Sequence, residues 1–256
     1  MRIKLLGAHN SESQNTRCMC LLVDGILAID AGSLTSSLTF EEQFSLKAVL
    51  LTHSHYDHIR DIPAFAINLF LGQKSTEIYT HQAVFDTLTQ NFLNSPVYAA
   101  FHKLPEGQPA VNFQLVQPSH PFQIGEYSIL GIPVNHSVPT LGFQVKDSRG
   151  RSFFYSGDTG NNAASVWKSI SPDVLFIEVT GCNRWLELME KTGHLTPALL
   201  KKDLLTIKQL KGTLPRVIAV HLNPHDEAEI KSELAALSGE LAIQIEPAYE
   251  GMVIDL

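Results

Sequence analysis

The sequence predicts an α/β protein in which two β-sheets pack face to face between outer helices, a four-layer αββα sandwich. Strand-like and helix-like stretches alternate along all 256 residues, and each half begins with hairpin-connected strands before it continues with strand–helix units. No linker rich in Gly, Ser or Pro divides the chain, and 44% of its residues are hydrophobic. That composition can bury one large core, so we expect a single domain over residues 1–256.

The first half is expected to open with three strands and to continue with strand–helix units. Asp24-Gly25 is a two-residue hairpin signal between the second and third strands. The apolar run Lys47–Thr52 is typical of a strand buried on both faces, and helical spacing follows it. The expected strands are Ile3–Leu6, Arg17–Val23, Ile26–Asp30, Lys47–Thr52 and Glu77–Thr80, and the expected helices are Ile59–Leu71 and Gln82–Phe92.

In the second half, proline and glycine separate three short strands within residues 111–134. Pro197 and Gly212 mark the start and the end of a long helix, because proline suits the first helical turn and glycine the C-terminal cap. The other expected elements are the hairpin of Leu141–Lys146 with Ser152–Ser156, the strands Asp173–Glu178, Arg216–Val220, Ala242–Ile245 and Met252–Ile254, and the helices Pro197–Lys211 and Asp226–Leu237.

Charge, hydropathy and cysteine content exclude several classes of protein. The net charge of −7 provides no global basic field for a nucleic-acid backbone. Apolar runs are too short to span a bilayer, and the N-terminus lacks the pattern of a signal peptide. Three cysteines without a CxxC spacing indicate buried thiols in a reducing compartment, so we expect a cytoplasmic protein without membrane association.

A dense cluster of metal-ligating residues follows the apolar run Lys47–Thr52. The segment reads His53-Ser54-His55-Tyr56-Asp57-His58, with three imidazoles and a carboxylate. Packing these groups without a cation would be costly, whereas neutral imidazole and carboxylate are good ligands of Zn²⁺. In an extended segment residues i and i+2 point the same way, so His53 and His55 can hold one ion. Asp57 and His58 lie on the turn into the next helix and can reach a second ion.

Two adjacent metal ions need more than four ligands, and three later residues are suitable. His136, Asp158 and His221 each lie where an apolar strand gives way to a loop. Strand ends along one edge of a sheet converge in space, which is where sites are built in layered α/β folds. We therefore expect these side chains to meet the HxHxDH turn.

These residues together resemble the metallo-β-lactamase superfamily of dinuclear zinc hydrolases along nearly the whole chain. The ligand set that the resemblance implies is His53, His55 and His136 for one metal ion, Asp57, His58 and His221 for the other, and Asp158 as the bridge between them. It also implies that Asp30, within Ile29-Asp30-Ala31-Gly32, orients a ligating histidine. The implied cofactors are two Zn²⁺ ions, with Mn²⁺ or Fe as substitutes.

Such a pair of ions, about 3.5–4 Å apart, lowers the pKa of a bridging water and supplies hydroxide at neutral pH. A ligand set of His and Asp without thiolates leaves coordination positions for water and substrate, as in catalytic zinc sites. We therefore expect a metal-dependent hydrolase, with Asp57 counted among its catalytic groups as well as its ligands.

Glu178 and His194 indicate the substrate class. Neither is needed to complete the ligand set, and a carboxylate beside His194 would fix its tautomer and favour its protonated form. A histidine of this kind suits protonation of a leaving alkoxide. Both features, together with the segment Gly193-His194-Leu195-Thr196-Pro197, resemble the phosphodiesterase branch of the superfamily. Within that branch they resemble the class II 3′,5′-cyclic-nucleotide phosphodiesterases more than they resemble ribonuclease Z.

The resemblance implies that cAMP or cGMP is hydrolysed to the 5′-nucleotide. A metal-bridging hydroxide would attack phosphorus in line while His194, oriented by Glu178, assists departure of the 3′-oxygen. The partner is then a small-molecule phosphodiester rather than a nucleic acid. Related enzymes are frequently dimers, so a homodimer is an expectation by analogy.

Three alternatives remain. A ribonuclease Z-like tRNA 3′-processing endonuclease is disfavoured because the chain is acidic and we find no insertion large enough for an RNA-binding arm. A thioester or lactone hydrolase would leave the Glu178/His194 pair without a role. A catalytically dead metal-binding scaffold would not need an intact ligand set.

Overall fold

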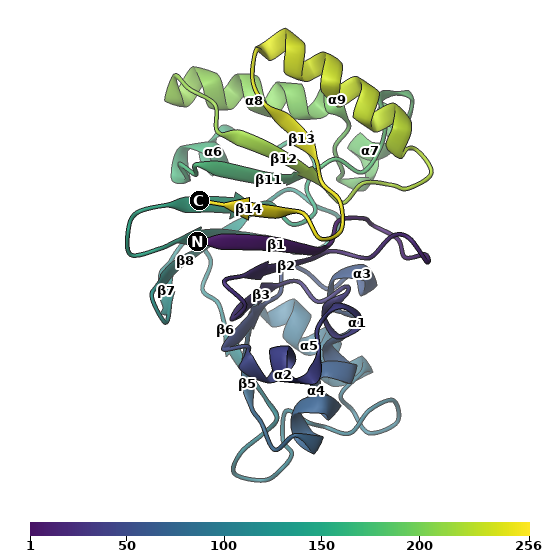
Figure 1. Cartoon of the computed structure of the whole chain (residues 1–256), viewed down its shortest axis with the longest axis vertical. Coiled ribbons are helices and arrows are strands. Elements are labelled where there is room, and N and C mark those ends of the chain that lie inside the picture. The colour runs from purple at the N-terminus through teal and green to yellow at the C-terminus, as the bar shows by residue number, and fades with distance from the viewer. The chain divides into compact units, whose positions relative to one another are not determined.

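The computed structural model describes all 256 residues, which form two compact units. Unit 1 comprises Met1–Gly7, Arg17–Gln117 and Glu250–Asp255, and unit 2 comprises Ala8–Thr16, Pro118–Tyr249 and Leu256. Each unit contains one seven-stranded mixed sheet with helices of its own (Figure 1). The expectation of a single domain over residues 1–256 stays a prediction.

Unit 1 combines an antiparallel and a parallel part in one sheet. Its strands are β1 (Arg2–Gly7), β2 (Cys20–Val23), β3 (Leu27–Ile29), β4 (Ala48–Leu50), β5 (Thr76–Thr80), β6 (Val111–Leu115) and β14 (Val253–Asp255). They lie in the order β14-β1-β2-β3-β4-β5-β6, antiparallel from β14 to β3 and parallel from β3 to β6. Asp24 and Gly25 connect β2 to β3 with φ values of 47° and 74°, as a tight hairpin turn requires.

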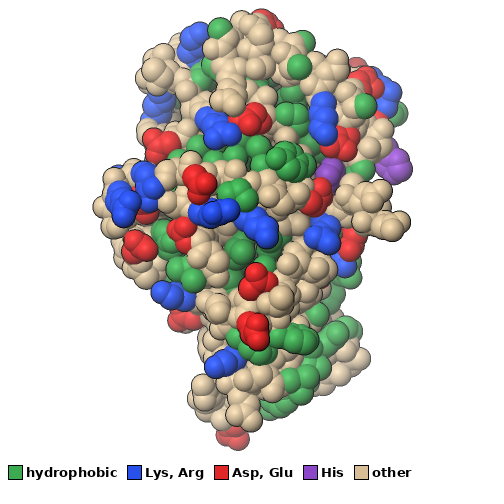
Figure 2. All heavy atoms as spheres, viewed as in Figure 1, with side chains coloured by type: hydrophobic (Ala, Val, Ile, Leu, Met, Phe, Trp, Pro, Cys, Tyr) green, Lys and Arg blue, Asp and Glu red, His purple; other side chains and the backbone are tan.

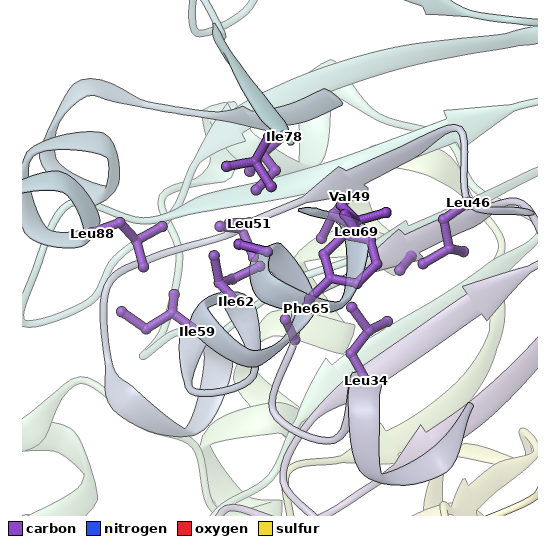
Figure 3. Close-up of a cluster of buried hydrophobic side chains, with 14 of the residues drawn as sticks. Leu34, Leu46, Val49, Leu51, Ile59, Ile62, Phe65, Leu69, Ile78 and Leu88 are labelled. Carbon is purple, nitrogen blue, oxygen red and sulfur yellow. The ribbon is translucent and has the colours of Figure 1, made fainter. Parts of the chain in front are cut away.

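The helices of unit 1 pack on one face of this sheet. They are α1 (Leu34–Ser37), α2 (Phe40–Ser45), α3 (Tyr56–Ile59), α4 (Ile62–Leu71) and α5 (Gln82–Asn91). Phe65 and Leu69 of α4 and Leu88 of α5 meet Val49 and Ile78 of the strands in a fully buried cluster (Figure 3). Apolar burial on this scale stabilises the unit.

Unit 2 repeats the arrangement, with an antiparallel part that again precedes the parallel part in the sequence. Its strands are β7 (Pro121–Ile124), β8 (Tyr127–Pro133), β9 (Leu141–Lys146), β10 (Ser152–Tyr155), β11 (Val174–Glu178), β12 (Arg216–Val220) and β13 (Ile245–Pro247). They lie in the order β13-β12-β11-β10-β9-β8-β7, with β10 to β13 parallel and β7 to β10 antiparallel.

The helices of unit 2 are α6 (Ala164–Ser169), α7 (Leu186–Thr192), α8 (Pro197–Lys211) and α9 (Glu227–Leu241), with the 3₁₀ turn η1 (Asn183–Trp185) before α7. Trp167 of α6, Leu204 of α8 and Leu234 of α9 pack with Leu175 and Val217 of the sheet. Each unit therefore contains a mixed sheet with helices of its own, as the sequence predicts for each half of the chain.

Most predicted elements are present, with boundary changes that have physical causes. The predicted helix Ile59–Leu71 begins later, as α4 at Ile62, because Pro63 in its first turn has no N–H group to donate to the carbonyl of Ile59. The predicted strand Ala242–Ile245 is wrong at its start, since α9 continues to Leu241 and ends on Ala242 in the left-handed conformation.

All three cysteines are buried free thiols. Burial raises the pKa of the Cys18 thiol to about 11, so this group stays protonated at neutral pH. No helix combines the length and the apolar character that crossing a membrane requires.

Asp203 is a buried carboxyl group inside unit 2. Its side chain, 2% exposed on α8, accepts hydrogen bonds from the indole N–H of Trp167 and the backbone N–H of Asn162, both at 3.3 Å. Burial raises the pKa of Asp203 from 3.8 to about 7. The folded chain therefore binds this proton more tightly than the unfolded chain, and the stability that results is lost as the pH rises toward 7.

We predict that Asp203→Asn removes this pH dependence, because asparagine can accept both hydrogen bonds without a charge. The free energy of unfolding of the wild type should fall relative to that of Asp203→Asn by roughly 2 kcal/mol between pH 5 and pH 8, measured by urea denaturation. Glu187→Gln, which removes an exposed carboxylate, is the matched control. A wild-type-to-variant difference that is constant over this pH range would contradict the prediction.

Candidate metal centre

The metal-binding turn of unit 1 begins where β4 ends. The chain leaves the sheet at Leu50 and runs extended through His53 and His55, and then α3 forms one helical turn that carries Asp57 and His58. The rings of His53 and His55 lie 4.7 Å apart, and those of His53 and His58 lie 4.1 Å apart. Nε2 of His58 lies 3.6 Å from Oδ2 of Asp57. The structure thus brings all four predicted residues of this turn together.

A buried carboxylate fixes the orientation of two of these imidazoles. Asp30, fully buried directly after β3, contacts Nδ1 of His58 at 2.7 Å through Oδ2. The hydroxyl of Thr52 donates to Asp30 at 3.0 Å and lies 3.0 Å from Nδ1 of His53. Since its one proton goes to the carboxylate, the Thr52 hydroxyl accepts from His53. Asp30 therefore orients His58 directly and His53 through Thr52, in the role that the resemblance implies.

The turn lies close against the segment after β3, and a glycine makes this possible. A Cβ at Gly32 would lie 2.0 Å from the carbonyl oxygen of Asp57, and Ala31 donates its backbone N–H to the carbonyl of His58 at 2.7 Å. Any side chain at position 32 would push α3 away, so Gly32 sets the position of Asp57 and His58.

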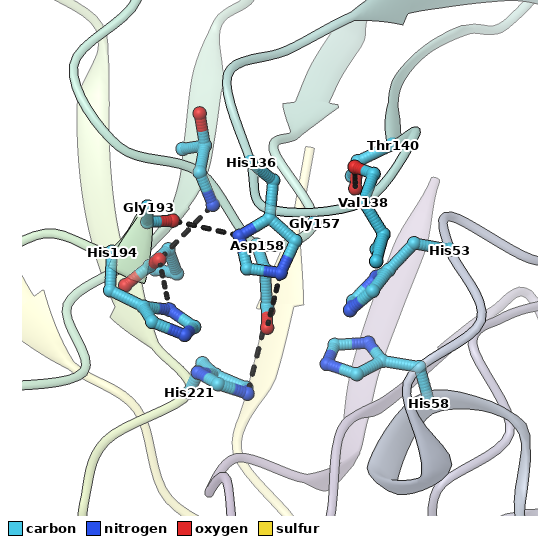
Figure 4. A network of polar contacts seen from close by, with 12 residues as sticks. His53, His58, His136, Val138, Thr140, Gly157, Asp158, Gly193, His194 and His221 are labelled. Atoms are coloured by element: carbon cyan, nitrogen blue, oxygen red, sulfur yellow. Dashed lines mark hydrogen bonds and ion pairs between the residues drawn. The ribbon is translucent and has the colours of Figure 1, made fainter. Parts of the chain in front are cut away.

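In unit 2, the C-terminal ends of parallel strands bring three donors to one edge of the sheet. Asp158 follows β10, Glu178 ends β11 and His221 follows β12. Nε2 of His221 lies 3.4 Å from Oδ1 of Asp158, and Nε2 of His136 lies 3.8 Å from Oδ2 of the same carboxylate (Figure 4). The predicted convergence of these strand ends is present within this unit.

The histidines of unit 2 are also held through Nδ1. Nδ1 of His136 lies 2.8 Å from the carbonyl oxygen of Gly193, and Nδ1 of His221 lies 2.8 Å from the hydroxyl of Thr180. The Thr180 hydroxyl donates to Glu178 at 2.8 Å, so it accepts from His221. Burial lowers the pKa of His136, which keeps its imidazole neutral as a metal ligand requires.

Glu178 is a fully buried carboxylate that orients His194. Its Oε1 contacts Nδ1 of His194 at 2.8 Å and accepts the backbone N–H of Thr159 at 3.1 Å. Its Oε2 accepts the backbone N–H groups of Thr180 and Leu195 at 3.0 and 3.2 Å. Although the ligand atoms of Glu178, His194 and His221 lie within 4.8 Å of one another, Glu178 already accepts these N–H groups. This environment suits a carboxylate that orients His194 better than one that binds a metal ion.

Sequence reasoning missed Thr52, Thr180 and the carbonyl group of Gly193. They contact Nδ1 of His53, His221 and His136, respectively, which are all predicted ligands. Thr52 and Gly193 are next in sequence to a residue that the sequence analysis identified, and Thr180 lies two residues after one. Threonine two residues after Glu178 at a strand end was the signal that could have revealed Thr180.

The donor sets fit metal ions on chemical grounds. The donor pairs at 3.4, 3.6 and 3.8 Å are longer than charge-assisted hydrogen bonds, which are about 2.7–2.9 Å. Two ligands each about 2.0–2.1 Å from a tetrahedral zinc ion lie roughly 3.4 Å apart, so these separations suit ligands that share a cation. Nδ1 contacts to carboxylate, carbonyl and hydroxyl groups also leave Nε2 as the coordinating nitrogen, as in metal-ligating histidines generally.

A family model described as a β-lactamase superfamily domain matches residues 22–222. This chain belongs to the β-lactamase superfamily. Among solved structures, unliganded yeast PDE1 matches this superfamily member with a TM-score of 0.85 at 14% identity, over 100% of this chain and 99% of that one. The α/β sandwich and the family that the sequence predicts are therefore confirmed.

Curated relatives of this superfamily member include proteins named as 3′,5′-cyclic-nucleotide phosphodiesterases and proteins named as ribonuclease Z. A 3′,5′-cyclic-nucleotide phosphodiesterase of Aliivibrio fischeri is 28% identical over 188 residues, covering 65% of this chain and 55% of that protein. A ribonuclease Z of Thermococcus kodakarensis is 30% identical over 156 residues, covering 57% and 46%. The chain thus spans about half the length of these relatives.

Thr180→Val should weaken Zn²⁺ binding by about 10- to 100-fold, because loss of the hydroxyl releases Nδ1 of His221. Competition with a chromophoric chelator measures this affinity. Thr180→Ser keeps the hydroxyl and should bind Zn²⁺ as the wild type does. Wild-type affinity in Thr180→Val together with a loss in Thr180→Ser would show that the methyl group, rather than the hydrogen bond, matters.

Proposed function

We propose that the chain is a metal-dependent phosphodiesterase that hydrolyses 3′,5′-cyclic nucleotides such as cAMP or cGMP to 5′-nucleotides. The observation that carries the proposal is the contact of His194 with the buried Glu178 at 2.8 Å, beside the donors Asp158 and His221. Membership of the superfamily and the relatives named as cyclic-nucleotide phosphodiesterases support the same activity.

The proposed cofactors are two Zn²⁺ ions, for which Mn²⁺ or Fe could substitute. The proposed ligands are His53, His55 and His136 for one ion, Asp57, His58 and His221 for the other, and Asp158 for both. Bound zinc supplies Lewis acidity and a nucleophile at neutral pH. Preoriented imidazoles in each unit support this assignment, since their orientation requires no rearrangement on binding.

The proposed role of His194 is to protonate the 3′-oxygen as its bond to phosphorus breaks. Nδ1 of His194 is held by Glu178, so Nε2 is the atom that would carry the transferred proton. The side chain of His194 is 17% exposed, which leaves it within reach of a ligand, whereas Glu178 is fully buried. The carboxylate stabilises the imidazolium that donates the proton, and water supplies the new oxygen on phosphorus.

A small phosphodiester is favoured over RNA by the charge of the chain. The net charge is −7, and the face in Figure 2 intersperses Lys and Arg with Asp and Glu rather than gathering them into a basic surface. RNA binding depends strongly on such a surface. Ribonuclease Z activity is the second candidate because of the 30% identical relative. The expectations of a cytoplasmic location and of a homodimer stay predictions.

The test of the proposed function is turnover of a substrate panel by the zinc- or manganese-loaded protein. We expect hydrolysis of cAMP or cGMP to the 5′-nucleotide, followed by chromatography, and loss of this activity on chelation. Cleavage of a pre-tRNA 3′ trailer without cyclic-nucleotide hydrolysis would favour the second candidate. Thioester hydrolysis alone, or metal binding without turnover, would overturn the proposal.

His194→Ala should lower kcat for cAMP by roughly 10²–10⁴-fold while the metal content stays at the wild-type level, because His194 is proposed to move a proton and not to bind the ions. Asp158→Ala should instead lose metal, measured by plasma emission spectrometry after dialysis. Equal loss of metal in both variants would contradict the separation of roles.

A further inference from the structure

Two loops of unit 2 each carry one proposed metal ligand. His136 lies on the loop between β8 and β9, and Asp158 lies on the loop that follows β10. Nε2 of His136 and Oδ2 of Asp158 are 3.8 Å apart (Figure 4). Neither residue belongs to a strand or a helix, so the separation of these two donor atoms depends on the contacts that the loops make with each other.

The side chain of Asn162 joins the two residues that stand next to these ligands in the sequence. Its Oδ1 accepts the backbone N–H of Asn135 at 3.1 Å, and its Nδ2 donates to Oγ1 of Thr159 at 3.0 Å. Asn135 immediately precedes His136, and Thr159 immediately follows Asp158. One planar amide group therefore connects the loop of one ligand to the loop of the other.

The backbones of the two loops are in direct contact around this amide. The carbonyl of Asn135 accepts the backbone N–H of Gly160 at 2.6 Å, and Nδ2 of Asn135 donates to the carbonyl of Asn161 at 3.1 Å. A Cβ at position 160 would lie 3.2 Å from that Nδ2, so the close approach of the loops favours glycine at this position. The contacts of Asn162 thus belong to a network that holds both loops as one hydrogen-bonded layer.

Helix α8 holds Asn162 from the other side. Asp203 of α8 is buried and accepts the backbone N–H of Asn162 at 3.3 Å. The same carboxyl group accepts the indole N–H of Trp167, which is also buried. A buried carboxyl group that loses a donor is costly, so this contact opposes movement of the Asn162 backbone. The amide bridge is therefore anchored to the core of unit 2.

We propose that Asn162 is a positioning residue of the metal centre, which holds His136 and Asp158 at the separation that a shared ion requires. The inference rests on the proposed function, since it uses the ligands proposed there. Asparagine suits the position because the bridge needs an acceptor and a donor on one rigid group. The contact of Gly193 with Nδ1 orients the ring of His136, whereas the Asn162 bridge fixes the loop of His136 against that of Asp158.

Zinc affinity tests this role without turnover. Asn162→Ala should weaken Zn²⁺ binding roughly tenfold, measured by competition with a chromophoric chelator, because outer contacts that place metal ligands have effects of this size. Asn161→Ala is the matched control, since Asn161 is also half-buried but donates its side chain to the carbonyl of Leu199 at 2.7 Å. The control should keep the wild-type affinity. Wild-type affinity in Asn162→Ala, or an equal loss in both variants, would overturn the proposal.

Two further measurements separate positioning from general loop stability. In the metal-free protein, the backbone amide of Asn135 should exchange its hydrogen faster in Asn162→Ala than in the wild type or in Asn161→Ala. Thr159→Val removes the other end of the bridge, so the double variant Thr159→Val/Asn162→Ala should bind Zn²⁺ about as weakly as the weaker single variant. Unchanged exchange at Asn135, or losses that multiply in the double variant, would overturn the proposal. A wild-type protein that binds no Zn²⁺ would instead count against the proposed function itself.

Discussion

The candidate metal centre depends on one repeated interaction, a buried carboxylate that holds two imidazoles through Nδ1. In unit 1, Asp30 contacts His58 directly and reaches His53 through the hydroxyl of Thr52. In unit 2, Glu178 contacts His194 directly and reaches His221 through the hydroxyl of Thr180. Each relay fixes the tautomer of its histidines, so that Nε2 is the atom presented to a metal ion or a substrate.

Strand ends place Asp30 and His221, and the energetic cost of this placement is visible in their backbone conformation. Asp30 and His221 each follow a strand directly and have φ values of 59° and 60°, in the left-handed region that residues other than glycine rarely adopt. Strain of this kind costs about 1–3 kcal/mol per residue and persists only where the surroundings enforce it. Here the buried strands and the carboxylate hydrogen bonds hold both residues in this conformation. The orientation of the donors in each unit therefore depends on the stability of its sheet.

Sequence patterns predict the parts of this structure that depend on local periodicity and on side-chain type. The buried strand before His53, the hairpin at Asp24-Gly25 and the helix Pro197–Lys211 are correct because apolar runs, turn residues and caps act locally. The threonine relays were missed because they join residues distant in sequence, such as Thr52 with Asp30, through tertiary packing. The short helices α1, α2, α6 and α7 were missed for a similar reason, since a helix of only a few residues carries little periodic signal.

The central proposal is that the predicted ligand set binds a pair of metal ions. Crystals of the zinc-loaded protein, measured at the zinc absorption edge, test it most directly. The account predicts two anomalous peaks per chain, one with His53, His55 and His136 and the other with Asp57, His58 and His221 at about 2.0–2.2 Å, with Asp158 contacting both. Two peaks each surrounded by residues of one unit alone, or no peak at these side chains, would contradict it.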